Sequence, residues 1–254
     1  MRKIIMCVLV ILLAGTVGAM AMTAQEVLQK AEDRYIGNTS KAQVQMDIVD
    51  KGGNVRERKM TISRRKADSS NKDNFIHFVA PPDIRNTTYL VNEKNREKQK
   101  WIYLSAFKNV RKIVAEDYGL AFVSSDFTYE DMDDVRADDY VASDLREEKL
   151  GDTDVYSIVV TKKDGNTSYS RVIMKVCKKT FVVLRAEMYD KKASDKLVKE
   201  MTAAKLELVQ EIWTPMEVTM KDLIKGTHTR LQTAKIAYDL PLGDEEFSRR
   251  NMEK

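Results

Sequence analysis

The sequence is poor in the residues on which most catalytic and metal sites depend. Its 254 residues include two cysteines, Cys7 and Cys177, and two histidines, His77 and His228. It also lacks the motifs of serine hydrolases, zinc proteases, dithiol oxidoreductases and phosphate-binding loops. These absences argue against the commonest catalytic machineries. We therefore expect a protein that is not an enzyme and that holds neither a cofactor nor a metal ion.

A strong charge of one sign is also missing. The chain has 43 Lys and Arg against 39 Asp and Glu, a formal net charge of +4, whereas nucleic-acid binders usually carry a concentrated basic field. We therefore expect no nucleic-acid partner. One acidic cluster is the best candidate for a calcium site, but the glycine of a calcium-binding loop is absent. We therefore interpret the cluster as a solvated acidic edge or as the N-terminus of a helix. The cluster comprises Asp126, Glu130, Asp131, Asp133 and Asp134.

The first 21 residues contain the longest apolar run. Two basic residues precede a run from Ile4 to about Val17, and small residues stand at positions 19 and 21, which is typical of a secretory signal peptide. A membrane anchor is the alternative, but the run is shorter than the ~20 residues that span a bilayer. We expect export and then a single domain, residues 22–254, that acts as a monomer. Cys177 alone cannot form an internal disulfide there.

After one predicted helix, the hydrophobic pattern is that of strands. Thr23 and Glu26 form a T-x-x-E capping box ahead of an apolar stripe of helical period. From Gln43 on, apolar and polar residues alternate between short polar turns, which predicts an antiparallel sheet that closes into a barrel or bends into half of one. The expected strands are residues 43–49, 55–65, 74–79, 88–93, 100–104, 110–114, 140–149, 155–162, 168–176, 181–189, 196–202, 205–209, 217–223 and 229–238.

Two stretches interrupt this pattern. Pro81 and Pro82 fix φ and remove two backbone donors, so they predict a stiff corner between two strands. Residues 115–134 are too long for a turn and apolar in their first half, and such insertions are commonly lid-like. We expect a lid over an apolar cavity, with a fixed plug of the core as the alternative. The lid residues would be Tyr118, Leu120, Phe122 and Val123.

Methionines recur on alternating strand positions. Methionine fills irregular space and adapts to variable apolar ligands, so an inward-facing set could line a cavity, with ordinary core packing as the alternative. The set comprises Met46, Ile48, Met60, Ile62, Phe78, Ile102, Leu104, Met174, Met188 and Met220. The alternation leaves open whether Ile102 and Leu104, or instead Trp101 and Tyr103, face the cavity.

Four stretches, in this order over most of the chain, carry a resemblance to a known family. They are FVAPPDIRNTTYLVNE (78–93), KQKWIYLSAFKNVRKI (98–113), FVSSDFTYEDM (122–132) and IWTPMEVTMKDLIKGTHTRL (212–231). Together they resemble the outer-membrane lipoprotein-sorting protein-like family, relatives of the periplasmic lipoprotein carrier LolA that are often encoded beside exporters of the resistance-nodulation-division (RND) type. The resemblance implies a mainly β fold, a strongly curved, incomplete antiparallel β-barrel of about 11 strands with short helices covering its open mouth.

The resemblance also implies a function. A member would act in the periplasm as a carrier or chaperone that binds lipid or lipoprotein acyl chains non-covalently, with an RND-type exporter as its inner-membrane partner. An envelope lipid sensor or regulatory binding module is the alternative, because such modules share the half-barrel architecture. Arg85, in the proline corner, is a candidate contact for a lipid headgroup, and a salt bridge at the rim is its alternative role.

Overall fold

The computed structural model describes residues 22–68, 70–193 and 196–254. The signal peptide predicted for residues 1–21 lies outside the described residues, as does its alternative, a membrane anchor. Within the described ranges, no helix is long and apolar enough to cross a membrane.

Helix α1 (Ala24–Asp33) begins where the sequence predicts it. The Thr23 hydroxyl accepts a hydrogen bond from Glu26 N at 3.2 Å, and the Glu26 carboxylate accepts one from Thr23 N at 2.7 Å. This reciprocal capping box satisfies backbone donors that the first turn leaves free. Val27 and Leu28 are buried and join the main core. The prediction of a capped helix here is confirmed.

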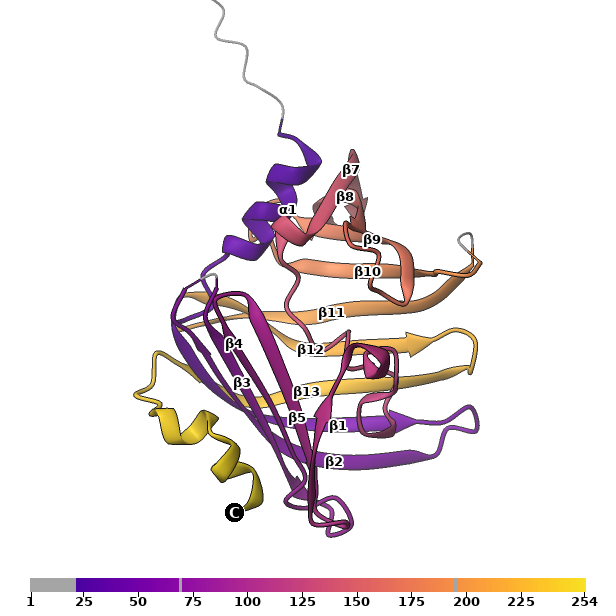
Figure 1. Ribbon diagram of the computed structural model, residues 1–254. Helices are drawn as coiled ribbons and strands as arrows, with labels where there is room; N and C mark the ends of the chain where they lie inside the picture. The colour runs from indigo at the N-terminus through magenta and orange to yellow at the C-terminus, as the bar shows by residue number, and fades with distance from the viewer. Residues whose placement is uncertain (1–21, 69, 194–195) are drawn as a thin grey trace, which may run out of the picture.

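Most of the chain forms one antiparallel sheet of 13 strands (Figure 1). Its order is β6-β5-β4-β3-β2-β1-β13-β12-β11-β10-β9-β8-β7. The mainly β class is confirmed, whereas the strand count of about 11 that the family resemblance implied is too low. The strands are β1 (Thr39–Val49), β2 (Val55–Lys66), β3 (Lys72–Ala80), β4 (Thr88–Lys94), β5 (Glu97–Leu104), β6 (Asn109–Ile113), β7 (Tyr140–Leu150), β8 (Thr153–Lys162), β9 (Tyr169–Cys177), β10 (Val183–Asp190), β11 (Leu197–Val209), β12 (Ile212–Asp222) and β13 (Thr227–Tyr238).

The sheet consists of two meanders joined at one seam. Strands β1 to β6 follow one another in chain order on one side, and β13 back to β7 do so on the other. At the seam β1 pairs with β13, so that Met46 lies opposite Leu231. Within the described ranges no ladder joins β6 to β7, and the curved sheet therefore stays open between these two strands (Figure 1).

Strand β11 differs from the prediction, which placed two strands at residues 196–202 and 205–209. The chain continues through as one strand, with Lys205 at a φ of 52°, and the pairing with β12 resumes beyond it. Lys205 is thus a local irregularity of the ladder and not a turn. Ala203 and Ala204 precede it, and the low β-propensity of alanine explains why the pattern suggested an end there.

The corner between β3 and β4 contains a cis peptide bond between Ala80 and Pro81. The amides of Ile84 and Arg85 both donate to Pro81 O, at 3.2 and 2.9 Å, and the Ile84 side chain is buried beneath the turn. The two prolines therefore lie in a connection between two strands, where the sequence predicts a corner, and the hydrogen bonds to Pro81 O make this corner tight and not wide.

Each face of the sheet carries an apolar cluster. The concave face holds the main core, to which Ile102 belongs. On the convex face, Trp101 packs with Phe247, where the short 3₁₀-helices η4 (Asp244–Phe247) and η5 (Arg249–Glu253) lie outside the bend of the sheet (Figure 1). Ile102 therefore faces the concave side and Trp101 faces the C-terminal helices. The alternation in β5 alone did not decide between these two orientations.

Helices cover the concave side only in part. Helix α1 packs against β7 and β8 and contributes to the concave core. Three more 3₁₀-helices, η1 (Ala115–Asp117), η2 (Phe122–Ser124) and η3 (Ala137–Asp139), belong to the connection between β6 and β7. Since η4 and η5 lie on the convex face, the expectation of helices over the mouth does not hold for the C-terminal pair.

Candidate functional site

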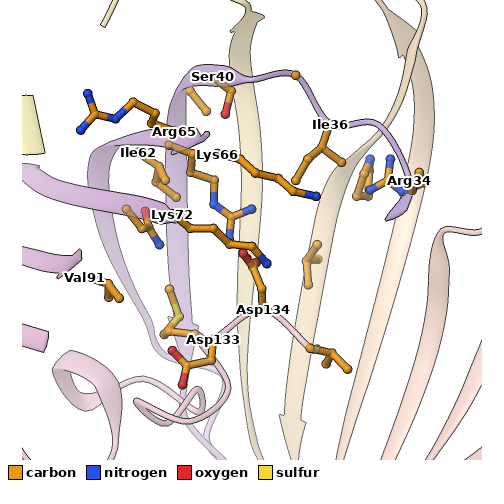
Figure 2. Close-up of a pocket in the computed structure, with 18 of the residues that line it drawn as sticks. Arg34, Ile36, Ser40, Ile62, Arg65, Lys66, Lys72, Val91, Asp133 and Asp134 are labelled. Atoms are coloured by element: carbon orange, nitrogen blue, oxygen red, sulfur yellow. The ribbon is translucent and has the colours of Figure 1, made fainter. Parts of the chain in front are cut away.

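A cavity of about 520 Å³ opens at one end of the concave face. It lies between the end of α1, the neighbouring ends of β1 to β4, strands β12 and β13, and residues 127–135 (Figure 2). Its volume is in the range of small-molecule binding sites. Its apolar lining includes Leu28, Ala31, Ile36, Ala42, Val44, Ile62, Ile76, Val91, Phe127, Met132, Val135, Met174, Val183, Pro215, Val218, Leu231 and Ile236.

The mouth of this cavity is charged (Figure 2). Asp134 forms an ion pair with Arg64 at 3.2 Å. Burial lowers the pKa of Lys72, and the carboxylates of Asp134 and Glu32 counteract that effect. The cavity therefore combines an apolar interior with a polar opening, which is the arrangement an amphiphile requires. The cationic side chains at the lining are Arg34, Arg64, Arg65, Lys66, Lys72 and Lys98.

Residues 115–139, which we call the plug segment, fill the middle of the concave face. Phe122 is fully buried, and its ring centroid lies 5.2 Å from that of Tyr89 and 5.7 Å from that of Tyr129, both in edge-to-face geometry. The ring of Phe78 on β3 lies 6.2 Å from it. Edge-to-face contacts of this kind are favourable beyond the buried area alone, so Phe122 is held as part of the core.

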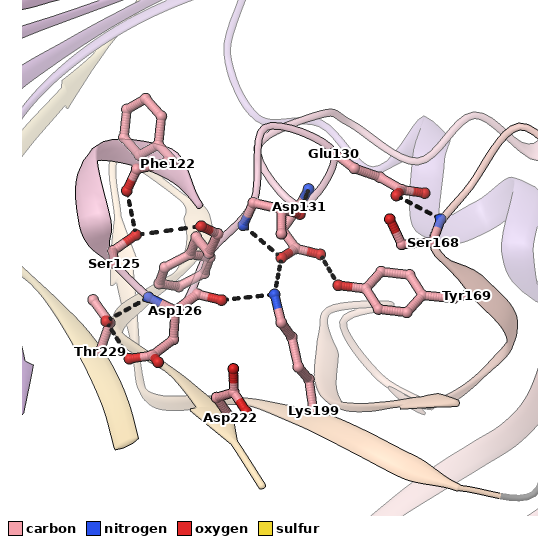
Figure 3. A network of polar contacts seen from close by, with 12 residues as sticks. Phe122, Ser125, Asp126, Glu130, Asp131, Ser168, Tyr169, Lys199, Asp222 and Thr229 are labelled. Carbon is pink, nitrogen blue, oxygen red and sulfur yellow. Dashed lines mark hydrogen bonds and ion pairs between the residues drawn. The ribbon is translucent and has the colours of Figure 1, made fainter. Parts of the chain in front are cut away.

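Carboxylates anchor the plug segment to the second meander (Figure 3). Lys199 Nζ on β11 lies 2.9 Å from Asp131 Oδ2, and the Tyr169 hydroxyl on β9 donates to Asp131 Oδ1 at 2.8 Å. The Thr229 hydroxyl on β13 donates to Asp126 Oδ2 at 2.6 Å. Burial and the Asp131 carboxylate raise the pKa of Tyr169 well above its usual range, so this phenol remains a hydrogen-bond donor.

The plug segment is anchored to the first meander as well. The Lys100 side chain on β5 is buried, and its Nζ donates to Asp133 Oδ2 at 2.7 Å and lies 3.8 Å from the ring centroid of Tyr118. Burial lowers the pKa of Lys100, and the Asp133 carboxylate counteracts that effect. Arg136 forms a buried ion pair with Glu93 on β4. The segment therefore bridges both halves of the open sheet.

The acidic cluster is not the solvated edge that its sequence suggests. Asp126 is buried, and Glu130 accepts a hydrogen bond from Ser168 N at 2.9 Å. The partners of these carboxylates lie up to about a hundred residues away along the chain, so the local pattern could not reveal them. Among the residues that the structure describes, no group of three or more His, Cys, Asp or Glu side chains could hold a metal ion.

The four residues predicted to form a lid do not share one surface. Phe122 is 0% exposed and Leu120 is 51% exposed, whereas Tyr118 and Val123 are half-buried. Val123 has a φ of 42°, which is rare for a β-branched residue, and its carbonyl accepts a hydrogen bond from Arg58. This geometry is that of the alternative interpretation, a fixed plug. Closure of the segment over the cavity stays a prediction.

All ten residues predicted to face inward lie in the main core or pack against it. Only Ile62 and Met174 also line the cavity. Contact of the other eight with a ligand stays a prediction; they are Met46, Ile48, Met60, Phe78, Ile102, Leu104, Met188 and Met220. Leu28, Ala31 and Ile36 also line the cavity and were not predicted to do so. The periodicity of α1 predicts a buried stripe but not a cavity beneath it, and Ile36 lies beyond the end of α1.

Arg85 lies at the other end of β3 from the cavity mouth. Its Nε donates to Val79 O at 3.3 Å, and its side chain is exposed. Strand β3 runs for nine residues from Lys72, which lines the cavity, to the corner, a span of roughly 25 Å at about 3.3 Å per residue. Arg85 therefore lies far from this cavity mouth, and its contact with a lipid headgroup stays a prediction.

The comparisons with known proteins point to one fold. A family model described as "Uncharacterized protein" matches residues 70–254, and none of the curated proteins compared with this chain matches it. A solved DUF1329 family protein from Desulfovibrio piger is similar, with 28% identity, a TM-score of 0.84, and coverage of 90% of this chain and 97% of that chain.

Two further solved structures share the architecture. An outer membrane lipoprotein-sorting protein domain from Vibrio parahaemolyticus has 23% identity and a TM-score of 0.85, covering 91% of this chain and 98% of that chain. A LolA superfamily protein from Nitrosomonas europaea has 20% identity and a TM-score of 0.68, covering 91% of this chain and all of that chain. At these identities the likeness concerns the fold.

Proposed function

This chain belongs to a LolA-like family, and we propose that it is a periplasmic carrier that binds lipid or lipoprotein acyl chains non-covalently and moves them to or from a membrane. The observation that carries the proposal is the cavity of about 520 Å³, with apolar walls and a charged mouth. The likeness in fold to the lipoprotein-sorting protein domain supports it.

Burial of an acyl chain in this cavity would be strongly favourable. Each CH₂ group removed from water contributes about 0.8 kcal/mol, so a ten-carbon acyl segment contributes roughly 8 kcal/mol when it is fully buried. Apolar side chains from α1, both meanders and the plug segment line the site, so an acyl chain there contacts protein on several sides. The mouth leaves an exit for release, and no movement of the anchored plug segment is required.

The proposal includes no covalent chemistry. Binding and release of an acyl chain need an apolar surface and an opening, and the charged groups of the plug segment are already engaged as structural anchors. We therefore infer that the protein is not an enzyme and works without a cofactor or metal ion.

The place of action and the partners are part of the same proposal. The apolar run in residues 1–21 supports export to the periplasm, and the family resemblance supports transfer of cargo in cooperation with an RND-type exporter of the inner membrane. We infer that the carrier acts as a monomer and has no nucleic-acid partner.

The test is the lipid content of protein purified without detergent, measured by mass spectrometry of organic extracts. We expect extractable lipid from the wild type and much less from Val218→Trp, which places a large side chain at the cavity lining. Thr219→Trp is the matched control, because alternate residues of β12 point to opposite faces. Equal lipid in all three proteins, or none in the wild type, would refute the proposal.

A second measurement separates carrier from sensor. A carrier should lose its lipid on mixing with acceptor vesicles. If the lipid instead stays bound and changes the affinity for a protein partner, the lipid-sensor alternative replaces the carrier.

A further inference from the structure

A second, smaller pocket of about 210 Å³ adjoins the cavity mouth. It is formed by the chain that leaves α1, residues 33–38, and by residues 66–68 at the end of β2. Both pockets are lined by Arg34, Ile36, Gly37, Asn38 and Lys66. The apolar cavity thus meets an outer pocket whose lining includes four charged residues, Asp33, Arg34, Lys66 and Asp68.

Two of the cations at this junction form no ion pair with the described residues. Over residues 22–68, 70–193 and 196–254, no carboxylate lies within 4.0 Å of the charged groups of Arg34 or Lys66, although Arg34 Nη1 donates to the Trp213 carbonyl at 2.8 Å. Figure 2 shows both side chains at the same end of the cavity. Since Arg34 is half-buried, its charge lacks both full hydration and an ionic partner.

The other cations at the mouth are paired. Arg65 lies 2.7 Å from Asp73, and Lys72 lies 3.9 Å from Glu32. Arg64 and Lys98 have partners in the acidic residues of the plug segment. Arg34 and Lys66 are therefore the cations of the mouth that form no ion pair among the described residues, although Lys66 lies near enough to Asp134 to help lower the pKa of that carboxyl. Both line the cavity together with the apolar residue Ile36.

We propose that Arg34 and Lys66 bind the phosphate group of an amphiphile whose acyl chain occupies the cavity. This proposal rests on the proposed function and names the class of headgroup. A phosphate offers several acceptor oxygens, so it can accept from the planar guanidinium of Arg34 and from the ammonium of Lys66 together.

The electrostatics of Arg34 support this assignment. Burial lowers its pKa, Tyr238 counteracts that effect in part, and the neighbouring Arg64 acts in the same direction as burial. An anion bound at the junction would compensate both effects. Asp33 and Asp68 also line the outer pocket, where Asp33 accepts from Gln29 and Asp68 accepts from Asn71. Because these carboxylates would repel an anion, the proposal places the phosphate where the two pockets share Arg34 and Lys66.

The test compares two lipids with the same acyl chain. Lysophosphatidylglycerol carries the phosphate and monoacylglycerol lacks it, and both are titrated below their critical micelle concentrations into the purified protein. Hydrogen bonds to charged groups are individually strong, so we expect the wild type to bind the phosphate-bearing lipid at least about tenfold more tightly. The double variant Arg34→Gln/Lys66→Gln should lose this preference and keep its affinity for monoacylglycerol.

A matched control and a third ligand complete the design. Lys51→Gln/Arg56→Gln removes two exposed cations near the hairpin at the far end of β2 and should keep the preference. Equal binding of both lipids by the wild type, or an unchanged preference in Arg34→Gln/Lys66→Gln, would overturn the phosphate site alone. Binding of neither lipid would overturn the proposed function itself. Glycerol phosphate binding as tightly as the lipid would show a site for free phosphate and not for a headgroup.

Discussion

Lys199 on β11 and Asp131 in the plug segment form an ion pair of 2.9 Å, with side chains only 11% and 4% exposed. Lys199 Nζ also donates to the Asp126 carbonyl at 2.7 Å. One lysine therefore holds two positions of the plug segment against the sheet. Because removal of one partner leaves a desolvated charge behind, this pair is a sensitive point of the fold.

Replacement of Lys199 by Met should lower the free energy of unfolding by about 3 kcal/mol, since the Asp131 carboxylate would stay buried without its cation. Urea denaturation followed by circular dichroism measures the loss. Lys205→Met is the matched control on the same strand. Its pair with Glu217 involves a lysine that is 61% exposed, so the control should lose less than about 1 kcal/mol. Similar losses in the two variants would contradict the anchoring role.

Phe122→Ala should destabilise the protein by about 3 to 5 kcal/mol, because it removes a fully buried ring from the aromatic cluster with Tyr89 and Tyr129. Leu120→Ala, two residues away in the same segment but half exposed, should change stability by no more than about 0.5 kcal/mol. Thermal unfolding of both variants makes the comparison. A small effect of Phe122→Ala would mean that the plug segment is a loosely attached lid.

Acid should weaken the attachment of the C-terminal helices at Glu246. This carboxylate accepts hydrogen bonds from the Ser63 hydroxyl at 2.6 Å and from Lys41 Nζ at 2.9 Å. Burial raises its pKa, but these bonds outweigh burial, so the pKa lies below 4.5. Because the pKa is lower in the folded than in the unfolded chain, the stabilisation is complete above pH 4.5 and is lost as the pH falls through the lowered value.

The fluorescence of Trp101 can report this change, since Trp101 packs with Phe247 beside Glu246. A Trp213→Phe background removes the second tryptophan from the signal. We expect an acid transition below pH 4.5 that Glu246→Gln abolishes. The same transition in both proteins would assign it to other carboxylates.

Glu211→Gly should stabilise the protein by about 0.5 to 1 kcal/mol. Gln210 and Glu211 form the two-residue turn between β11 and β12, with φ values of 47° and 64°, and glycine adopts positive φ without a steric cost. Glu207→Gly, within β11, should instead destabilise by a similar amount because glycine weakens a strand interior. Chemical denaturation measures the change in the free energy of unfolding of each variant. A lower stability of Glu211→Gly would show that Glu211 is not strained in this turn.

Much of the fold was predictable because its signals are local. The capping box of Thr23 and Glu26 marks the helix, and alternation marks the strands, since both patterns involve residues a few positions apart. The pairing of β1 with β13 carries no local signal. It depends on which faces bury most apolar surface once the whole chain is present, so the sequence indicated a meander but not the position of its seam.

The candidate site was less predictable for a related reason. Alternation correctly places Met46 and Ile62 on the concave face, but it cannot show that other side chains cover Met46 while Ile62 borders empty space. The cavity mouth also uses Arg34 and Ile36, which lie in the irregular connection after α1 and belong to no periodic pattern. Ion pairs between residues far apart in the sequence, such as Lys199 and Asp131, also determine which acidic side chains are buried in the structure and which are exposed. The local sequence does not show these partners.

The seam between β1 and β13 also has a consequence for how the chain acquires its structure. The other ladders join strands that are neighbours in sequence, whereas Met46 and Leu231 lie far apart along the chain. Such contacts carry the largest loop-closure entropy and form slowly. We expect the two meanders to form from local contacts and the sheet to become continuous only when β13, its last strand, docks. A chain that ends before β13 would expose the inner edges of two half-sheets, each a template for pairing with another chain.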